Sequence, residues 1–330
     1  MAPAPLLSVR RLRVHYPKRG LLPWTGTPTI KAVDDLHFDL QPGETLGIVG
    51  ESGCGKSTLA RALVGLQAAS AGSIRFRGQE LIGLDRKEWK PLRREVQLVF
   101  QDPLGSLSPK MKVIDIVAEP LKALMPELPA DQRKARALAM LARVGLGEEL
   151  ADRKASELSG GQGQRVGIAR ALIVEPKLLI CDEPVSALDV SIQAQIINLL
   201  ADLARERNLA MIFIAHDLAV VRQLADRVLV MYLGKVMEQG RADDVYTRAR
   251  HPYTRALLEA VPVIAADGEK PKRRRLLGGA AIQPGQPPMG CVFHPRCPLV
   301  EHACVQSVPG LRKVEGAEQY AACHFVAAGG

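Results

Sequence analysis

Four short apolar runs, each leading into glycine or polar residues, constrain the fold of this 330-residue chain more than any other feature. Runs of this length without alternation are typical of parallel strands buried on both faces of a sheet. Stretches with apolar residues at helical spacing separate them and predict helices. We therefore expect an α/β fold whose chemistry lies at the carboxyl ends of the strands. The runs are TLGIVG (45–50), EVQLVFQ (95–101), KLLICDEP (177–184) and LAMIFIAHD (209–217), and the helical stretches are 57–66, 135–144, 166–173 and 192–203.

Other segments predict antiparallel structure at the margin of this sheet. Residues 7–16 alternate as an edge strand does, and the alternation changes phase between Val9 and Leu12. A Pro/Gly-rich insertion at 17–28 precedes a second strand at 32–40. The segment RVLVMYLGKVMEQG (227–240) predicts a hairpin that closes the sheet around Gly234.

Length and composition bound the organisation of the chain. Hydrophobic residues make up 47% and aromatic residues 4%, so the core should be aliphatic, and the length favours two domains. From about residue 263 the composition shifts to Pro, Gly, Cys and basic residues, which places a domain boundary between 1–262 and 263–330. Because the chain has neither an apolar run of roughly 20 residues nor a secretory leader, we expect a cytosolic location.

The net charge of +9 is compatible with nucleic acid, a negative membrane surface or phosphate ligands as partners. The densest basic run is EKPKRRRLL, residues 269–277. A solvated linker is the simpler interpretation of this run, and a patch that faces an anionic membrane is the alternative.

The first glycine-rich loop, GESGCGKST, has the complete Walker A spacing from Gly50 to Ser57, after a predicted strand and before a predicted helix. Its glycines let backbone N–H groups point at phosphate oxygens, and the helix N-terminus adds partial positive charge. Lys56 should reach the outer phosphates of a nucleotide, and the Ser57 hydroxyl should bind Mg²⁺. The predicted binding residues of this loop are Gly50, Ser52, Gly53, Cys54, Gly55, Lys56, Ser57 and Thr58.

Polar side chains follow three of the predicted strands. Mg²⁺ prefers carboxylate oxygen, so Asp182 fits as its anchor, and Glu183 can polarise a water aimed at the γ-phosphate. Position alone makes His216 a candidate for a hydrogen bond to the γ-phosphate. Gln101 stands in a comparable place and could sense the metal or the attacking water.

A second glycine-rich loop, ELSGGQGQR, lies about a hundred residues after the first. Ser159 and Gln162 form a capping-box pattern, which accounts for a helix start. The pattern does not account for Gly160 and Gly161, which cost helix stability and allow a close approach of backbone to another group. A glycine-opened helix N-terminus is an anion receptor, so one nucleotide would have two phosphate-binding loops.

These motifs together resemble the ATP-binding subunit of ABC transporters, because the Walker A loop, Gln101, LSGGQ, LLICDEP, SALD and His216 occur in that order. The resemblance implies a P-loop NTPase core with an antiparallel β edge and a helical subdomain at about 102–175. It also implies that LSGGQ (158–162), called the signature loop below, closes on ATP held by the Walker A loop of a partner subunit. By the same resemblance, Tyr16 stacks on adenine and Asp189 faces the partner's site. Gly163 lies where relatives often carry a larger residue.

Four of the six cysteines, Cys291, Cys297, Cys304 and Cys323, lie in the last forty residues. Cytosolic chains seldom use disulfides, so bound metal is the better explanation. The spacings of five, six and eighteen residues are wider than zinc sites usually show, and four thiolates can also hold an iron–sulfur cluster. Zinc remains the alternative.

The tail resembles the C-terminal extension of oligopeptide and dipeptide permease ATPases, through HPYTRALLEAVP (251–262) and the following GC-x-F-x-x-R-C pattern. The segments PVSALDVS (184–191) and 16–28 resemble the second ATPase of that system. The resemblance implies a 4Fe–4S cluster on the four cysteines, and a heterodimer with a homologous ATPase. It further implies two transmembrane permease subunits, an extracytoplasmic binding protein as indirect partner, and a peripheral location on the cytoplasmic face of the membrane.

The leading hypothesis is therefore an ATPase subunit that drives a peptide importer, with no nucleic acid as partner. A soluble ABC ATPase acting on nucleic acid or ribosomes is the alternative that the basic charge would accommodate. A plain P-loop kinase would have no use for residues 159–162. Dipeptides, oligopeptides, nickel chelates and haem all remain open as cargo.

Overall fold

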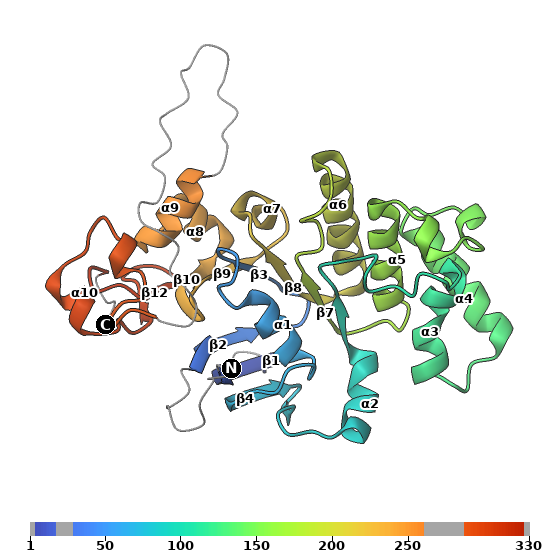
Figure 1. Cartoon of the computed structure of the whole chain (residues 1–330), viewed down its shortest axis with the longest axis horizontal. Helices are drawn as coiled ribbons and strands as arrows, with labels where there is room; N and C mark the ends of the chain where they lie inside the picture. Colours follow the sequence, from blue (N-terminus) through green and yellow to red (C-terminus); the bar gives the residue numbers. More distant parts are fainter. Residues whose placement is uncertain (1–3, 18–28, 261–286, 327–330) are drawn as a thin grey trace, which may run out of the picture.

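The computed structural model describes residues 4–17, 29–260 and 287–326, and an eight-stranded sheet runs through its centre (Figure 1). The strand order is β11-β12-β10-β9-β3-β8-β7-β6, in which β6, β7, β8, β3 and β9 are parallel neighbours. The strands are β3 (Thr45–Val49), β6 (Val96–Val99), β7 (Leu178–Asp182), β8 (Ala210–Ala215), β9 (Arg227–Tyr232), β10 (Lys235–Arg241), β11 (Arg312–Lys313) and β12 (Gln319–Ala321). The parallel sheet expected from the apolar runs is thus present.

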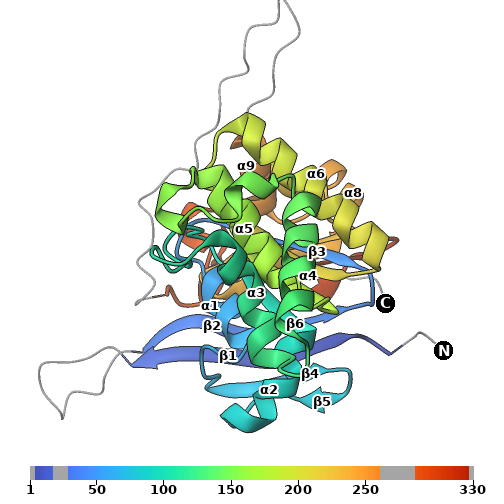
Figure 2. The same cartoon turned by 90° about the vertical axis from the view of Figure 1, so that its right-hand side faces the viewer.

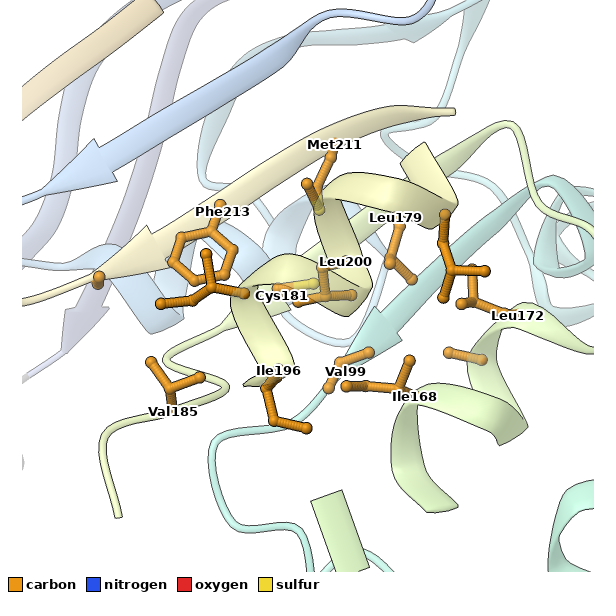
Figure 3. Close-up of a cluster of buried hydrophobic side chains, with 14 of the residues drawn as sticks. Val99, Ile168, Leu172, Leu179, Cys181, Val185, Ile196, Leu200, Met211 and Phe213 are labelled. Atoms are coloured by element: carbon orange, nitrogen blue, oxygen red, sulfur yellow. The ribbon is translucent and has the colours of Figure 1, made fainter. Parts of the chain in front are cut away.

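Residues on alternate positions of the central strands serve two separate cores, which explains why these strands read as unbroken apolar runs. In β7, Leu178 and Ile180 pack toward the antiparallel sheet. Leu179 and Cys181 point to the opposite face, where they meet α5 and α6. Figure 3 shows this second core, in which Leu179 and Met211 from the strands lie against Leu200 of α6.

A four-stranded antiparallel sheet covers the first face, in the order β2-β1-β4-β5. The predicted phase change in the first strand is a bulge, because the register shifts between Val9 and Leu12 and Arg11 adopts a φ of 47°. The edge-strand prediction for 7–16 was wrong, since this strand is flanked on both sides by others. The strands are β1 (Leu7–Pro17), β2 (Thr29–Leu40), β4 (Ala71–Phe76) and β5 (Gln79–Glu80).

Helices cover the main sheet and build a lobe to one side of it, around α3, α4 and α5 (Figures 1 and 2). The helices of this lobe lie between residues 113 and 172, and the bounds of about 102–175 for a helical subdomain stay a prediction. The α-helices are α1 (Lys56–Leu63), α2 (Arg86–Glu95), α3 (Val113–Leu124), α4 (Ala130–Arg143), α5 (Gly160–Leu172), α6 (Val190–Arg207), α7 (Leu218–Arg222), α8 (Ala242–Thr247), α9 (Pro252–Ala260) and α10 (His302–Gln306). Short 3-10 turns lie at η1 (Glu148–Leu150), η2 (Ala155–Glu157) and η3 (His294–Arg296).

The C-terminal segment 287–326, called the extension below, continues the main sheet. Its strand β12 pairs antiparallel with β10, so β9 and β10 form a hairpin as predicted but do not close the sheet. The predicted boundary at 262/263 and the basic run near 269–275 lie outside the described residues. Over the described ranges, no helix combines the length and the apolar character that crossing a membrane requires.

Candidate functional site

The Walker A loop lies between β3 and α1, at the carboxyl end of the parallel strands. Gly55 adopts a φ of 107°, and a Cβ there would lie 1.9 Å from the carbonyl oxygen of Ala32 in β2. Glycine is therefore required both by the backbone conformation and by the close approach of β2. Cys54 is buried in this loop, and burial raises the pKa of its thiol, so it packs as a small filler.

Lys56 is only 3% exposed and points along the loop rather than into solvent. Its Nζ donates hydrogen bonds to the carbonyl oxygens of Gly50 at 2.8 Å and Glu51 at 3.2 Å. The same nitrogen lies 3.4 Å from Oε1 of Glu183. The ammonium group is thus held at the floor of the loop, where incoming phosphate oxygens would meet it.

Ser57 and Asp182 come together from α1 and β7. The Ser57 hydroxyl donates a hydrogen bond to Oδ1 of Asp182 at 2.9 Å. Burial raises the pKa of Asp182, the Ser57 hydrogen bond lowers it, and the neighbouring charge of Glu183 raises it. Both groups offer oxygen atoms, which are the ligands that Mg²⁺ prefers. A bound cation would also stabilise the charged form of the buried Asp182 carboxylate.

Glu183 follows Asp182 with a φ of 46°, a conformation that L-residues seldom adopt. Its carboxylate lies beside Lys56, with Oε1 3.4 Å from the ammonium nitrogen. The Gln101 side chain, from the loop after β6, donates a hydrogen bond to Oε2 of Glu183 at 2.8 Å. Lys56, Gln101 and Glu183, which are far apart in the sequence, therefore form one connected group.

Lys56, Ser57, Gln101 and Glu183 line a cavity of about 530 Å³ together with groups that sequence reasoning missed. Gly50, Cys54 and Asp182 are not among its described lining residues. Among the described residues around it, Tyr16 is not a lining residue, whereas its cross-strand neighbour Ile30 is. Some of the lining residues that were not predicted belong to the extension, more than two hundred positions after the Walker A loop in the sequence. The lining residues without a prior prediction are Ile30, Lys31, Ala32, Asp34, Leu233, Gly234, Lys235, Pro287, Pro288, Met289, Gly290, Val292 and Val308.

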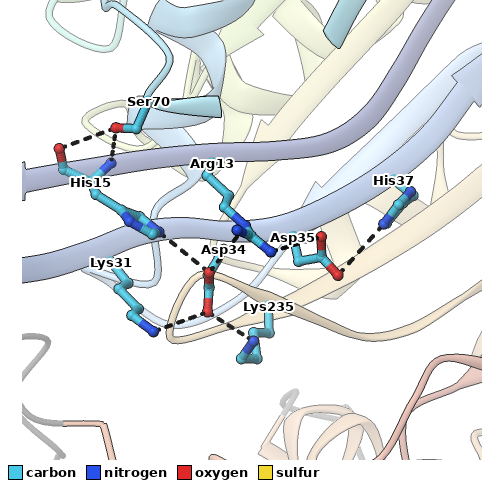
Figure 4. Close-up of polar contacts among 8 residues, drawn as sticks. All are labelled: Arg13, His15, Lys31, Asp34, Asp35, His37, Ser70 and Lys235. Atoms are coloured by element: carbon cyan, nitrogen blue, oxygen red, sulfur yellow. Dashed lines mark hydrogen bonds and ion pairs between the residues drawn. The ribbon is translucent and has the colours of Figure 1, made fainter. Parts of the chain in front are cut away.

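Asp34 organises the positive charges at the rim of this cavity (Figure 4). Its carboxylate accepts a hydrogen bond from Lys235 at 2.9 Å and lies 3.9 Å from Lys31 and 3.3 Å from His15. Burial alone would raise the pKa of Asp34, but the hydrogen bond and charge of Lys235, with Lys31, lower it. The two lysines are thereby fixed beside the cavity, where their charge suits an anionic ligand.

The signature loop opens α5, the helix of the lobe that lies beside α6 (Figure 1). The predicted capping box is present: Ser159 Oγ accepts from the Gln162 N–H, and Gln162 Oε1 accepts from the Ser159 N–H. Gly161 lies so close to Ile192 that a Cβ would approach it to 3.0 Å, which is an intrachain reason for this glycine. Ser159 and Gly160 are exposed to solvent.

Asp189 and His216 are also exposed. The described residues that line the cavity include neither Asp189 nor His216, and they include none of residues 159–162. Asp189 precedes α6 beside the signature loop, and His216 follows β8. The structure therefore divides the predicted site residues into a group around the Walker A loop and an exposed group.

The four cysteines of the tail come together in the extension. Cys291 and Cys304 lie in one buried core with Cys297 packed against it, and the Cys291 N–H donates a hydrogen bond to the carbonyl oxygen of Cys304 at 2.8 Å. Burial raises the pKa of the Cys291 thiol. Yet within residues 4–17, 29–260 and 287–326, no group of three or more His, Cys, Asp or Glu side chains is arranged to hold a metal ion. The metal site expected here is thus not formed in this arrangement.

Comparison with known proteins identifies two sequence families in the chain. The ABC transporter family matches residues 33–186, which contain the Walker A loop, Gln101, the signature loop and Glu183. The family described as "Oligopeptide/dipeptide transporter, C-terminal region" matches residues 237–304, which contain three of the four clustered cysteines.

Individual relatives match almost the whole chain. The oligopeptide transport ATP-binding protein OppF of Escherichia coli is 52% identical over 93% of this chain and 92% of its own length. The di/tripeptide transport ATP-binding protein DppF of Pseudomonas aeruginosa is 47% identical over 97% of both chains. A solved dimer of the ATP-binding cassette MJ0796 with ADP and Pi covers 72% of this chain and 98% of its own, with a TM-score of 0.65 and 29% identity.

Proposed function

This chain belongs to the ATP-binding subunits of ABC transporters of the oligopeptide and dipeptide type, and on that premise we propose that it hydrolyses ATP to drive peptide import. The observation that carries the proposal is the connected group of Lys56, Gln101 and Glu183 beside Ser57 and Asp182. The relatives named above are peptide-transport subunits, which favours this function over an ATPase that acts on nucleic acid or ribosomes.

We propose a task for each residue of this group. Lys56 and the loop N–H groups bind the outer phosphates, and Ser57, Asp182 and Gln101 would hold Mg²⁺. Bound Mg²⁺ neutralises charge that develops on the phosphate oxygens. Glu183 orients a water toward the γ-phosphate and accepts its proton, and the hydrogen bond from Gln101 fixes the carboxylate.

The exposed group is proposed to act on the nucleotide of a second subunit. None of residues 159–162, Asp189 and His216 lines the described cavity. Ser159, Gly160, Asp189 and His216 are exposed and so available to a partner, and Gly161 and Gln162 are partly buried. The solved MJ0796 cassette is a dimer, which supports pairing as the working state. We propose a homologous but distinct ATPase as the partner, and a role for Tyr16 on adenine once nucleotide is bound.

The remaining partners follow from the transporter assignment. We propose that two transmembrane permease subunits hold the ATPase pair at the cytoplasmic face of the membrane, and that an extracytoplasmic binding protein delivers peptide to them. Co-purification of the chain with membrane subunits supports this assignment. Recovery with ribosomes or nucleic acid, and without membrane subunits, overturns it.

The assignment of Glu183 is tested by the variant Glu183→Gln in the assembled complex. Turnover should fall by about 10²- to 10⁴-fold, because the amide can no longer accept a proton. ATP binding should persist, since Lys56 and the loop are unchanged. Glu127→Gln, which changes an exposed carboxylate of the helical lobe, is the matched control. Full turnover by Glu183→Gln contradicts the assignment.

We also propose that Cys291, Cys297, Cys304 and Cys323 hold a 4Fe–4S cluster in the cell, with zinc as the alternative ion. Support comes from the donor chemistry, since four neighbouring thiols suit thiolate-bound iron. Because no group of three or more His, Cys, Asp or Glu side chains among the described residues is arranged to hold a metal ion, binding would require the four side chains to rearrange. Anaerobically purified protein should contain iron and absorb near about 400 nm with bleaching on reduction. Protein with neither iron nor zinc refutes the proposal.

A further inference from the structure

Glu51 places a negative charge inside a loop that binds anions. It directly follows Gly50 in the Walker A sequence, and Lys56 donates a hydrogen bond to its carbonyl oxygen. A carboxylate at this position repels the triphosphate that the loop must accept. The carboxylate is about one-third exposed, so solvent alone does not screen it fully.

Arg296 of the extension neutralises this charge. Its Nη1 lies 2.8 Å from Oε2 of Glu51 and its Nη2 lies 3.0 Å from Oε1, which is a bidentate pair. Nη1 also donates to the Tyr232 hydroxyl at 3.2 Å. The Arg296 side chain is only 8% exposed, so the pair is shielded from salt and held in one geometry.

Aromatic packing fixes both partners of this pair. Arg296 ends the turn η3, which begins after the fully buried Phe293. The Phe293 ring packs against Tyr232 and Tyr253 at centroid distances of 5.5 and 5.3 Å. The Tyr253 hydroxyl in turn accepts a hydrogen bond from the Glu51 N–H at 3.0 Å. Glu51 is thus gripped at its N–H, its carbonyl and its carboxylate.

We propose that Arg296 is a positioning residue for ATP binding: it cancels the charge of Glu51 and holds the Walker A loop in the form that accepts phosphates. The extension thereby becomes part of the nucleotide site of its own chain, to which Met289, Val292 and Val308 already contribute a wall. This inference rests on the proposed function, because it takes the ligand of the loop to be ATP.

The decisive experiment is a charge-rescue series on the full chain, with a fluorescent ATP analogue and Mg²⁺ as the probe. Arg296→Met should weaken binding by about tenfold, because the loop that accepts the phosphates then carries an unpaired carboxylate on Glu51. Glu51→Gln should bind at least as tightly as the wild type. The double variant should recover most of the lost affinity, since no charge is left to cancel. Arg296→Lys should give an intermediate value.

Two further readouts separate this role from a purely structural one. The defect of Arg296→Met should shrink as salt is added, because screening replaces the missing guanidinium. In the assembled transporter the change should raise KM for ATP with little effect on kcat. Arg312→Met, at an exposed arginine of the same extension, is the matched control and should bind as the wild type does.

The outcomes decide the proposal. Wild-type affinity in Arg296→Met, or a double variant no better than Arg296→Met, overturns it. Should Arg296→Met not fold, Arg296→Lys and Glu51→Gln still test the charge argument. Lys56→Ala, run alongside, identifies a failure of the proposed function, since nucleotide binding that survives it does not occur at this loop.

Discussion

The two glycine-rich loops of this chain are alike in sequence and opposite in structure. The Walker A loop is enclosed by contacts within its own chain. Lys56 donates a hydrogen bond to the carbonyl oxygen of Gly50, and Glu51 is bonded to Tyr253 and Arg296. Residues of the extension line the adjoining cavity. The signature loop stands open, with Ser159 and Gly160 exposed and with a capping box as its side-chain hydrogen bonding. We therefore expect the Walker A loop to bind nucleotide within a single chain, whereas the signature loop needs the surface of a second subunit to complete its site.

This contrast gives a physical reason for ATP to link two subunits. The open loop offers a helix N-terminus to phosphate but lies away from its own chain's cavity. ATP bound at the enclosed loop of one subunit can therefore join it to the open loop of another. Hydrolysis removes the shared γ-phosphate contact and weakens that junction.

The strongest test of the contrast compares one variant in each loop. Lys56→Ala should abolish nucleotide binding by the isolated chain and lower turnover of the complex by about 10²- to 10³-fold. Gly160→Asp should leave binding by the isolated chain intact, because its loop does not line the cavity, yet lower turnover by a similar factor. Fluorescent nucleotide titration and ATPase assays measure the two effects. Loss of nucleotide binding by isolated Gly160→Asp would break the contrast.

A second prediction concerns the stability of the enclosed side. His251 is 1% exposed, its Nδ1 accepts the Tyr253 N–H at 3.0 Å, and burial lowers its pKa from 6.5 to about 4. Because the folded pKa lies below the unfolded one, its contribution to stability is present above about pH 6.5 and is lost as the pH falls toward 4. The free energy of unfolding should drop by about 2 kcal/mol from about pH 7 to about pH 5 on this account.

The measurement is chemical denaturation at both pH values. His251→Asn should remove this pH-dependent component, whereas His302→Asn, at an exposed histidine of the extension, should retain it. The buried Glu238 contacts the His251 N–H at 2.9 Å, and burial raises its pKa, which favours the fold at low pH instead. Since Glu238 is present in all three proteins, its effect cancels in the comparison. Equal slopes in wild type and His251→Asn would disprove the role of His251.

The smallest predicted effect belongs to the open loop. Ser159→Ala removes the side-chain acceptor of the capping box and should lower the free energy of unfolding by about 1 kcal/mol. Nucleotide affinity of the isolated chain should not change. Ser159→Asn, which keeps an acceptor, should restore stability. A loss of affinity in the isolated Ser159→Ala chain would show that the two loops communicate within one subunit.

Much of the fold could be predicted because its signals are local. Buried strands read as apolar runs, the helix of the signature loop carries its own capping box, and the bulge of β1 shows as a phase change. The Walker A loop and the two carboxylates at the end of β7 could likewise be predicted, since parallel strands bring their carboxyl ends to one edge of the sheet. The edge assignment of β1 failed because pairing with β4 leaves no trace in the strand's own pattern.

The rest depends on contacts between residues distant in sequence. Arg296 and Glu51 are 245 positions apart, and the sequence around either residue carries no pattern that predicts a contact with the other. The wall that the extension gives to the cavity was missed for the same reason. The four cysteines were found by counting, but composition cannot fix how the thiols are arranged around one another.

The pairing of β12 with β10 bears on the order in which this protein matures during synthesis. Glu238 in β10 cannot form its hydrogen bond with Gln319 until 81 more residues have been added. Glu51 in the Walker A loop cannot pair with Arg296 until 245 more residues have been added. A nascent chain that ends between residues 238 and 296 contains Gln101, Glu183 and His216 but lacks the arginine that pairs with Glu51. If Arg296 acts as proposed, full nucleotide affinity therefore requires that the extension has been synthesised and has folded against the Walker A loop.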